Sequence, residues 1–225
     1  ATDFDSSSTN LVFAAVVDQA NPAVAGLTID ADGDWQFDPD QTAYDDIPKG
    51  VTRNVLVKYS VTDEHQSVGT GQFIIQVAGT NDAPVATLMS DESVAEGAVP
   101  TLTGRVLATD ADKPSTVSFA LSGTIAGLTL HSDGTWEFNA TDPAYNSLAK
   151  GVTHDVTVSY VVTDDKTATD TGSFKIRVTG TNDAPIATYN ATSQAVENGS
   201  TISGTLTATD FDSSSTNLVF AAVVD

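Results

Sequence analysis

Hydrophobic and polar residues alternate with a period of two along several short segments of this chain. Many of the hydrophobic positions hold β-branched or aromatic residues. The segments are 55–61, 73–77, 102–108, 156–162, 174–178 and 202–208. This pattern is typical of half-buried strands, and no segment has the longer 3.6-residue period of an amphipathic helix. The pattern therefore predicts an all-β fold.

Tight turns join some of these strands. The segment 128–131 is followed by Ser132-Asp133-Gly134 and then by 135–138, which predicts a hairpin because Asp-Gly favours two-residue turns. Asp32-Gly33 introduces an equivalent segment earlier in the chain. About seven short strands in roughly 100 residues favour an immunoglobulin-like sandwich. We expect its core aromatic residues to be Trp35, Trp136, Tyr59 and Tyr160.

Self-similarity divides the chain into tandem repeats. Gly79-Thr-Asn-Asp-Ala-Pro84 recurs as residues 180–185, and many other matches share this offset. Residues 1–18 are identical to residues 208–225. We predict three segments: a head repeat (1–83) without its first strands, a complete middle repeat (84–183), and a tail (184–225) that holds the first strands of a further repeat. The spacing suggests a piece of a long array.

The cut ends predict how such pieces associate. The tail holds the strands that the head repeat lacks, so we expect head-to-tail strand complementation between molecules, or pairing of neighbouring repeats of one chain. Either copy of the 18-residue segment fits the shared position.

Acidic residues outnumber basic ones by 30 to 9, which gives a net charge of −21 and excludes most nucleic-acid partners. Of the acids, 25 are Asp and 5 are Glu. Asp favours turns and hard-cation sites, so this bias indicates loops and metal. Cysteine is absent, which excludes disulfides and thiolate sites. No apolar run reaches the ~18 residues of a membrane span, so we expect no membrane insertion of this segment.

Acidic motifs recur at three kinds of strand end. Asn-Asp-Ala-Pro follows a last strand, Asp-x-Asp follows an early strand, and an Asp ends each Tyr-containing strand. The residues are Asn81, Asp82, Asn182 and Asp183 for the first motif, Asp3, Asp5, Asp110, Asp112, Asp210 and Asp212 for the second, and Asp63 and Asp164 for the third. A single Asp at a strand end is equally typical of a turn cap.

Topology brings members of the three motifs together. In a sandwich, the loop after the second strand and the loop before the last strand lie at the same end. We therefore expect Asp110, Asp112 and Asp164 to meet Asn81 and Asp82. Two carboxylates at 4 Å repel by about 4 kcal/mol at an effective dielectric constant of 20. A site built only from hard oxygen ligands selects Ca²⁺ over zinc or copper, so we predict Ca²⁺ at these junctions.

These motifs resemble the cadherin-like VCBS-type repeats of giant bacterial RTX adhesins. The most specific element is Gly-Thr-Asn-Asp-Ala-Pro followed by Ala-Thr-Asp-x-Asp. The resemblance implies tandem cadherin-like sandwiches with calcium-bound linkers, type I secretion, an extracellular position on the bacterial cell surface, and a role in adhesion and biofilm formation. It also implies that Glu96 and Glu197 are calcium ligands, with Glu96 joining Asn182, Asp183, Asp210 and Asp212.

The resemblance thus implies an extender repeat whose linkers are stiffened by calcium, and two other functions are alternatives to it. A ligand- or glycan-binding module of the same adhesin needs an exposed aromatic platform, for which Trp35, Trp136 and the tyrosines are the candidates. An enzyme is not expected, because no nucleophile, phosphate-binding or zinc-protease motif is present. His65, His131 and His154 are isolated and lack the spacing of metal ligands.

Overall fold

A computed structural model describes residues 10–188, 192–213 and 217–222. Strands make up all of its extended secondary structure, and no α-helix occurs in these ranges. Accordingly, no helix of the described residues has the length and hydropathy of a membrane span. Contacts divide the chain into two compact units. The first extends to Pro84 and includes Thr109–Val117 and Thr163–Thr169, and the second holds the remainder.

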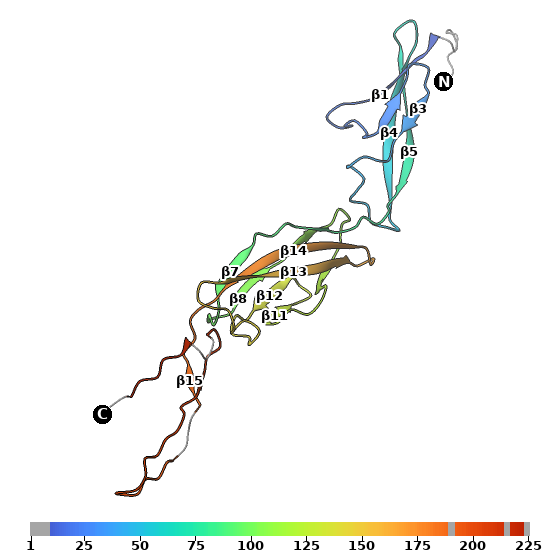
Figure 1. Cartoon of the computed structure of the whole chain (residues 1–225). Helices are drawn as coiled ribbons and strands as arrows, with labels where there is room; N and C mark the ends of the chain where they lie inside the picture. Colours follow the sequence, from blue (N-terminus) through green and yellow to red (C-terminus); the bar gives the residue numbers. More distant parts are fainter. Residues whose placement is uncertain (1–9, 189–191, 214–216, 223–225) are drawn as a thin grey trace. The chain divides into compact units, whose positions relative to one another are not determined.

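Most of the second unit is a β-sandwich formed by the middle repeat (Figure 1). One sheet has the strand order β10–β13–β14–β7, with bounds Val117–Leu121, Thr153–Asp164, Thr169–Thr179 and Glu92–Ala95. The other sheet has the order β11–β12–β8, with bounds Leu128–Leu130, Thr135–Phe138 and Leu102–Arg105. Burial alternates along β13 and β14, as the sequence pattern predicts.

The core of this sandwich is where alternation predicts it. Trp136 of β12 packs against Phe174 of β14, with ring centroids 5.2 Å apart, so the two sheets face each other through aromatic rings. Tyr160 is also fully buried, which confirms both aromatic residues as core. Gly104 of β8 makes this packing possible, because a Cβ atom there would lie 2.3 Å from Cζ2 of Trp136.

The head repeat supplies the sheets of the first unit. β1 (Val12–Ala15), β4 (Thr52–Thr62) and β5 (Val68–Ala78) form one sheet, and β2 (Leu27–Ile29) and β3 (Trp35–Phe37) form the predicted hairpin. Gly33 has φ 90° in its turn, as Gly134 has φ 88° in the matching hairpin.

The prediction that Trp35 is a core residue is wrong. Its side chain is 50% exposed, and Tyr59 is only half-buried. The reason is structural: the middle repeat covers its tryptophan with β8, and no strand of the head repeat takes that place in the described residues.

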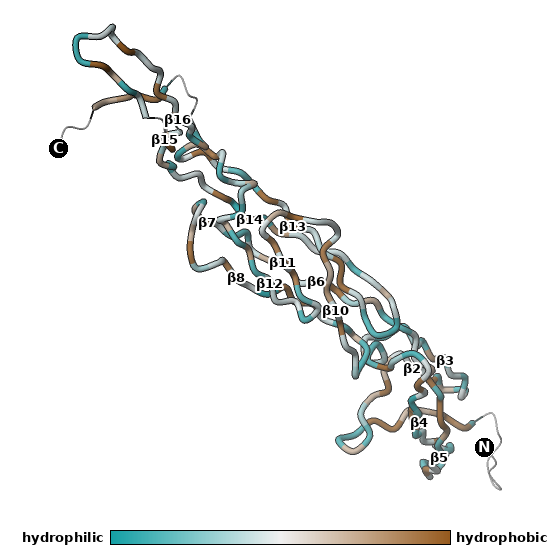
Figure 2. The backbone as a smooth tube through the Cα atoms, turned by 90° about the horizontal axis from the view of Figure 1, so that it is seen from below, coloured by the Kyte–Doolittle hydropathy of each residue, from teal (hydrophilic) through white to brown (hydrophobic). Residues whose placement is uncertain are grey.

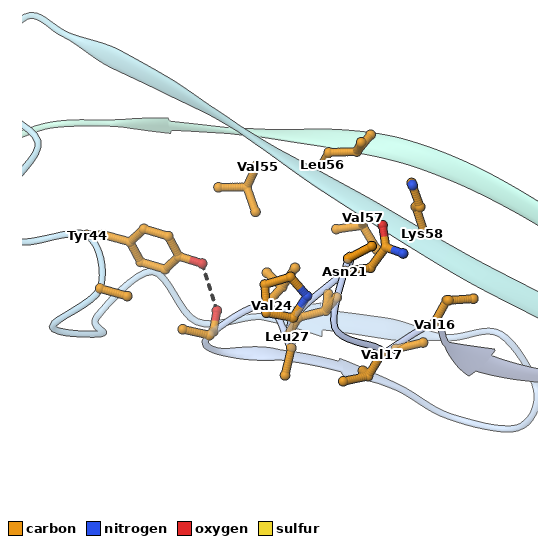
Figure 3. Close-up of a pocket in the computed structure, with 16 residues that line it drawn as sticks. Val16, Val17, Asn21, Val24, Leu27, Tyr44, Val55, Leu56, Val57 and Lys58 are labelled. Carbon is orange, nitrogen blue, oxygen red and sulfur yellow. Dashed lines mark hydrogen bonds between the residues drawn. The ribbon is translucent and has the colours of Figure 1, made fainter.

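An apolar cavity of about 350 Å³ lies between β4 and the segment that follows β1. Figure 3 shows Val17, Val24, Leu27 and Val57 around it. The hydroxyl of Tyr44 donates a 2.9 Å hydrogen bond to the carbonyl of Ala25 at one side. Burial raises the pKa of this hydroxyl, so it remains a neutral donor.

Short strand pairs lie at the start of the middle repeat and in the tail. β6 (Val85–Ala86) pairs with β9 (Ala108–Thr109), and β15 (Ile186–Ala187) pairs with β16 (Ala208–Thr209). The predicted strand over 202–208 is wrong except at its last residue, since residues 202–207 form no strand. Alternating side chains specify a strand only where a neighbouring strand pairs with the backbone. In the described part of the tail, only Thr207 of residues 202–207 has such a partner, since its carbonyl accepts from the N–H of Thr188 at 2.9 Å.

Candidate functional site

The first unit brings together the acidic residues that the motifs single out. Asn81 and Asp82 follow β5, Asp110 and Asp112 follow β9, and Asp164 ends β13. The side-chain amide of Asn81 donates to Oδ2 of Asp164 at 2.8 Å. The backbone N–H of Asp82 donates to Oδ2 of Asp112 at 3.0 Å, and the N–H of Asp112 donates to Oδ1 of Asp110 at 2.9 Å.

Two of these carboxylates lie in an unfavourable electrostatic environment. Asp112 is 5% exposed, and its Oδ1 has no hydrogen-bond partner. Burial raises the pKa of Asp82, and the negative charges of Asp112, Asp45 and Asp110 raise it further. A bound cation would remove both penalties, because it supplies the charge and the contact that these oxygens lack.

Asp164 plays a second part by fixing a turn. Its Oδ1 accepts hydrogen bonds from the backbone N–H groups of Lys166 and Ala168, both at 2.8 Å. The hydrogen bond from Asn81 lowers the pKa of Asp164, and these backbone hydrogen bonds lower it further. Asp164 is therefore held ionised at the junction, with one oxygen turned to its own loop and the other to Asn81.

Asp63 occupies the equivalent turn of the head repeat. Its Oδ1 accepts from the backbone N–H groups of His65 and Ser67, both at 2.8 Å. No hydrogen bond of the described residues joins Asp63 to another predicted ligand. Asp3 and Asp5, its expected neighbours, lie outside the described residues.

A second acidic cluster lies within the second unit. Glu96 is 5% exposed, its Oε2 accepts from the backbone N–H of Thr181 at 3.1 Å, and its Oε1 has no partner. Oδ2 of Asp183 is likewise buried without a partner. A hydrogen bond with Asp210 raises the pKa of Asp212, and a backbone hydrogen bond with Asp183 opposes that rise. The hydrogen bond between Asp210 and Asp212 lowers the pKa of Asp210.

The other two predicted ligands differ in their surroundings. The side-chain amide of Asn182 donates to the backbone carbonyl of Asp183 at 2.7 Å, as Asn81 does to the carbonyl of Asp82 at 2.9 Å. Glu197 is exposed, so the structure does not place it with the others.

Sequence reasoning missed residues that lack a motif of their own. Asp45 acts electrostatically on Asp82, and the carbonyl of its neighbour Asp46 accepts from the backbone N–H of Lys113 at 3.3 Å. The hydroxyl of Ser115 donates to Oδ2 of Asp110 at 2.7 Å. Asp45 is replaced by Asn146 in the middle repeat, so comparison of the repeats gives no signal for it.

The oxygen donors of these clusters are chemically uniform. All the side-chain groups are carboxylates, amides and hydroxyls, which suit Ca²⁺ and not thiophilic metals. Within the described residues, no three or more His, Cys, Asp or Glu side chains have the spacing of a metal site. The buried, unpartnered oxygens of Glu96, Asp112 and Asp183 nevertheless fit a hard cation.

Comparisons with known proteins agree with this architecture. Residues 81–177 match the family model of the bacterial Ig domain. The structure of human CDH23 EC21-23 is similar at a TM-score of 0.53 and 22% identity, covering 91% of this chain and 70% of that one. Drosophila N-cadherin EC1-4 gives a TM-score of 0.46 and 14% identity, covering 83% of this chain and 45% of that one. A search of curated protein sequences finds no match to this chain.

Residues 81–177 are therefore similar to a bacterial Ig domain, and the fold of the chain is similar to that of cadherin domains. The predicted all-β, immunoglobulin- and cadherin-like class is confirmed.

Proposed function

We propose that this chain is a stretch of calcium-rigidified extender repeats from a large, secreted bacterial surface adhesin of the RTX type. Such a protein holds a distal adhesive domain away from the cell and supports adhesion and biofilm formation. Domains of this fold class are typically non-enzymatic, and we propose a mechanical role. Type I secretion fits a chain without cysteine, because a chain exported unfolded cannot rely on disulfides. Calcium outside the cell then stabilises the folded repeats by mass action.

One observation supports calcium above all others. Three carboxylate oxygens, on Glu96, Asp112 and Asp183, are buried and have no hydrogen-bond partner among the described residues. An ionised carboxylate loses several kcal/mol when it is buried unpaired. The acidic motifs predicted Asp112 and Asp183 as calcium ligands, and the family resemblance implied Glu96. Their burial is explained if each oxygen faces an ion.

We infer two groups of ligands. Asn81, Asp82, Asp110, Asp112 and Asp164 hold calcium at the first junction, together with Asp45. The second junction uses Glu96, Asn182, Asp183, Asp210 and Asp212. When bound, the ion neutralises the clustered negative charge. The linker is then fixed, because the Asn-Asp pair and the Asp-x-Asp loop bind the same ion.

Calcium titration tests this function directly. We expect the melting temperature to rise with calcium, and small-angle scattering to show the chain extending to a narrower range of lengths. An ion present at 100 times its dissociation constant stabilises the folded state by about 2.7 kcal/mol. Magnesium at the same concentration is the control, because it tolerates this many protein ligands poorly. Unchanged melting and scattering in millimolar calcium would contradict the proposal.

The glycan-binding alternative receives no support from the exposed aromatic residues. Trp136 and Tyr160 are fully buried. Trp35 is exposed, but it occupies the position of Trp136 and packs against Phe73 with ring centroids 5.1 Å apart, so it is an uncovered core residue and not a platform.

A further inference from the structure

A lysine side chain lies beside the first acidic cluster, which comprises Asp82, Asp110, Asp112 and Asp164. β13 ends at Asp164, and the turn that follows holds Asp165 and Lys166. Figure 2 shows that this turn between β13 and β14 is strongly hydrophilic. The ammonium group of Lys166 forms an ion pair with Oδ2 of Asp165. The charge of Asp165 is therefore compensated by a cation of the protein itself.

A serine connects this ion pair to the first acidic cluster. The hydroxyl of Ser115 donates to Oδ2 of Asp110 at 2.7 Å. The same hydroxyl oxygen lies 3.5 Å from Oδ1 of Asp165. The carboxylate that pairs with the lysine is thus separated from a predicted calcium ligand by one hydroxyl group.

The charge of Lys166 also acts on the ligands directly. The hydrogen bond with Asp165 raises the pKa of Lys166, and the charges of Asp165, Asp164 and Asp112 raise it further. Asp112 is buried, and its Oδ1 has no hydrogen-bond partner among the described residues. A positive charge nearby favours the ionised form of such a carboxylate. It does so while that oxygen stays free for an ion.

The turn itself does not require a lysine. The equivalent turn of the head repeat holds His65 in place of Lys166. Each turn is closed by an aspartate whose Oδ1 accepts from the N–H groups two and four residues later, all at 2.8 Å. The residue after the histidine or lysine has a positive φ in both, 69° for Gln66 and 76° for Thr167. Since the backbone is alike with either side chain, the turn does not account for the lysine.

A second lysine ion pair provides the comparison. Nζ of Lys175, on β14, lies 3.8 Å from Oδ2 of Asp155, and the two side chains are 50% and 33% exposed. The side chains of Lys166 and Asp165 are 43% and 37% exposed. Pairs as exposed as these contribute little stability of their own. An effect of Lys166 that Lys175 does not share must therefore come from the first acidic cluster.

We propose that Lys166 regulates the first junction as a tethered cation, which partly neutralises the first acidic cluster without calcium and lowers the affinity of the cluster for calcium. Both effects have one cause, because a positive charge attracts the carboxylates and repels a second cation. The calcium part of this inference rests on the proposed function, whereas the part that concerns the calcium-free chain does not. Lys166 thus narrows the difference in stability between the calcium-free and calcium-bound junction.

Removal of the charge tests the calcium-free part. In chelator at low ionic strength, Lys166→Gln should lower the melting temperature more than Lys175→Gln does, as measured by differential scanning calorimetry. The difference should shrink in about 1 M salt, where the screening length falls to about 3 Å. Lys166→Arg keeps the charge and should melt as the native chain does. Equal melting of the two glutamine variants at low ionic strength would overturn this part.

A double-mutant cycle identifies the carboxylates on which Lys166 acts. In chelator, Lys166→Gln should lower the melting temperature less in a chain that also carries Asp112→Asn, because one of the attracted charges is gone. Combination with Asp32→Asn, at an exposed turn, should be additive. If the effects of Lys166→Gln and Asp112→Asn also add, the lysine acts only on Asp165, and its role in the cluster is refuted.

Calcium titration of the same variants tests the other part. In isothermal titration calorimetry at low ionic strength, Lys166→Gln should bind calcium about threefold more tightly than the native chain. Lys175→Gln and Lys166→Arg should bind with nearly native affinity. The second junction is unchanged in all three variants, so a change in affinity belongs to the first. An unchanged or weaker affinity of Lys166→Gln would overturn the regulation of calcium binding.

These outcomes separate the inference from the proposed function. If the native chain binds no calcium, the proposed function and the calcium part fail together, while the melting experiments in chelator still decide whether Lys166 neutralises the cluster. If the native chain binds calcium and Lys166→Gln binds it equally well, the proposed function stands and the regulatory role of Lys166 fails.

Discussion

The proposal of a bound cation rests on the surroundings of individual carboxylates. Turn-capping aspartates such as Asp63 use one oxygen for the backbone N–H groups that follow them. Asp112 differs, because it is buried and its Oδ1 has no hydrogen-bond partner in the part of the chain that the structure describes. Turn capping requires no such burial. It accounts for Asp63 but not for Asp112, whose burial a bound cation would explain.

The Asp82→Asn variant should reverse its effect on stability when calcium is added. Without calcium, the substitution should raise the melting temperature at neutral pH, because burial and the charges of Asp112, Asp45 and Asp110 raise the pKa of Asp82 and oppose its ionisation. With calcium, it should lower the melting temperature and weaken binding by about tenfold, or about 1.4 kcal/mol. Differential scanning calorimetry with and without chelator measures both signs.

The control for this reversal is Asp32→Asn, at an exposed turn position of the same repeat. It should change the melting temperature little in either condition. If Asp82→Asn destabilises the chain equally with and without calcium, the aspartate is a structural residue and not a ligand.

Asn81→Ala should destabilise the calcium-free chain in a pH-dependent way. The Asn81 amide is the largest cause of the lowered pKa of Asp164. A lowered pKa contributes stability above the ordinary carboxyl value of 3.8, and that stability disappears as pH falls through the lowered folded-state value. The difference in melting temperature between native and variant chains should therefore be constant near neutral pH and vanish in acid. A difference that persists in acid would show that Asn81 acts by another route.

The sequence predicted the hairpins, which depend on neighbouring residues, but not the strands and buried residues that depend on a distant pairing strand. The Asp-Gly hairpins form at both predicted places because two residues determine the turn. The segment 202–206 alternates like any strand and forms none, because no neighbouring strand pairs with it in the described part of the tail. Trp35 has the sequence context of Trp136 and the opposite exposure for the same reason.

The two tryptophans are a matched pair for measuring how much a covering strand adds to the stability of the aromatic core. Trp136→Ala should cost about 3–5 kcal/mol, as removal of a large aromatic residue from a packed core does. Trp35→Ala should cost much less in the dilute chain, because half of its surface is already in water. Urea denaturation followed by circular dichroism gives both values. Equal losses would mean that the head repeat covers Trp35 in solution.

For the whole molecule, the motifs predicted which residues matter but not every contact among them. Asn81 with Asp164 and Asp82 with Asp112 were predicted to meet because sandwich topology brings strand ends together. Asp45 was missed because its place beside Asp82 depends on a loop without a repeat signature. The amide of Thr181, which holds Glu96, was missed because any residue offers a backbone N–H.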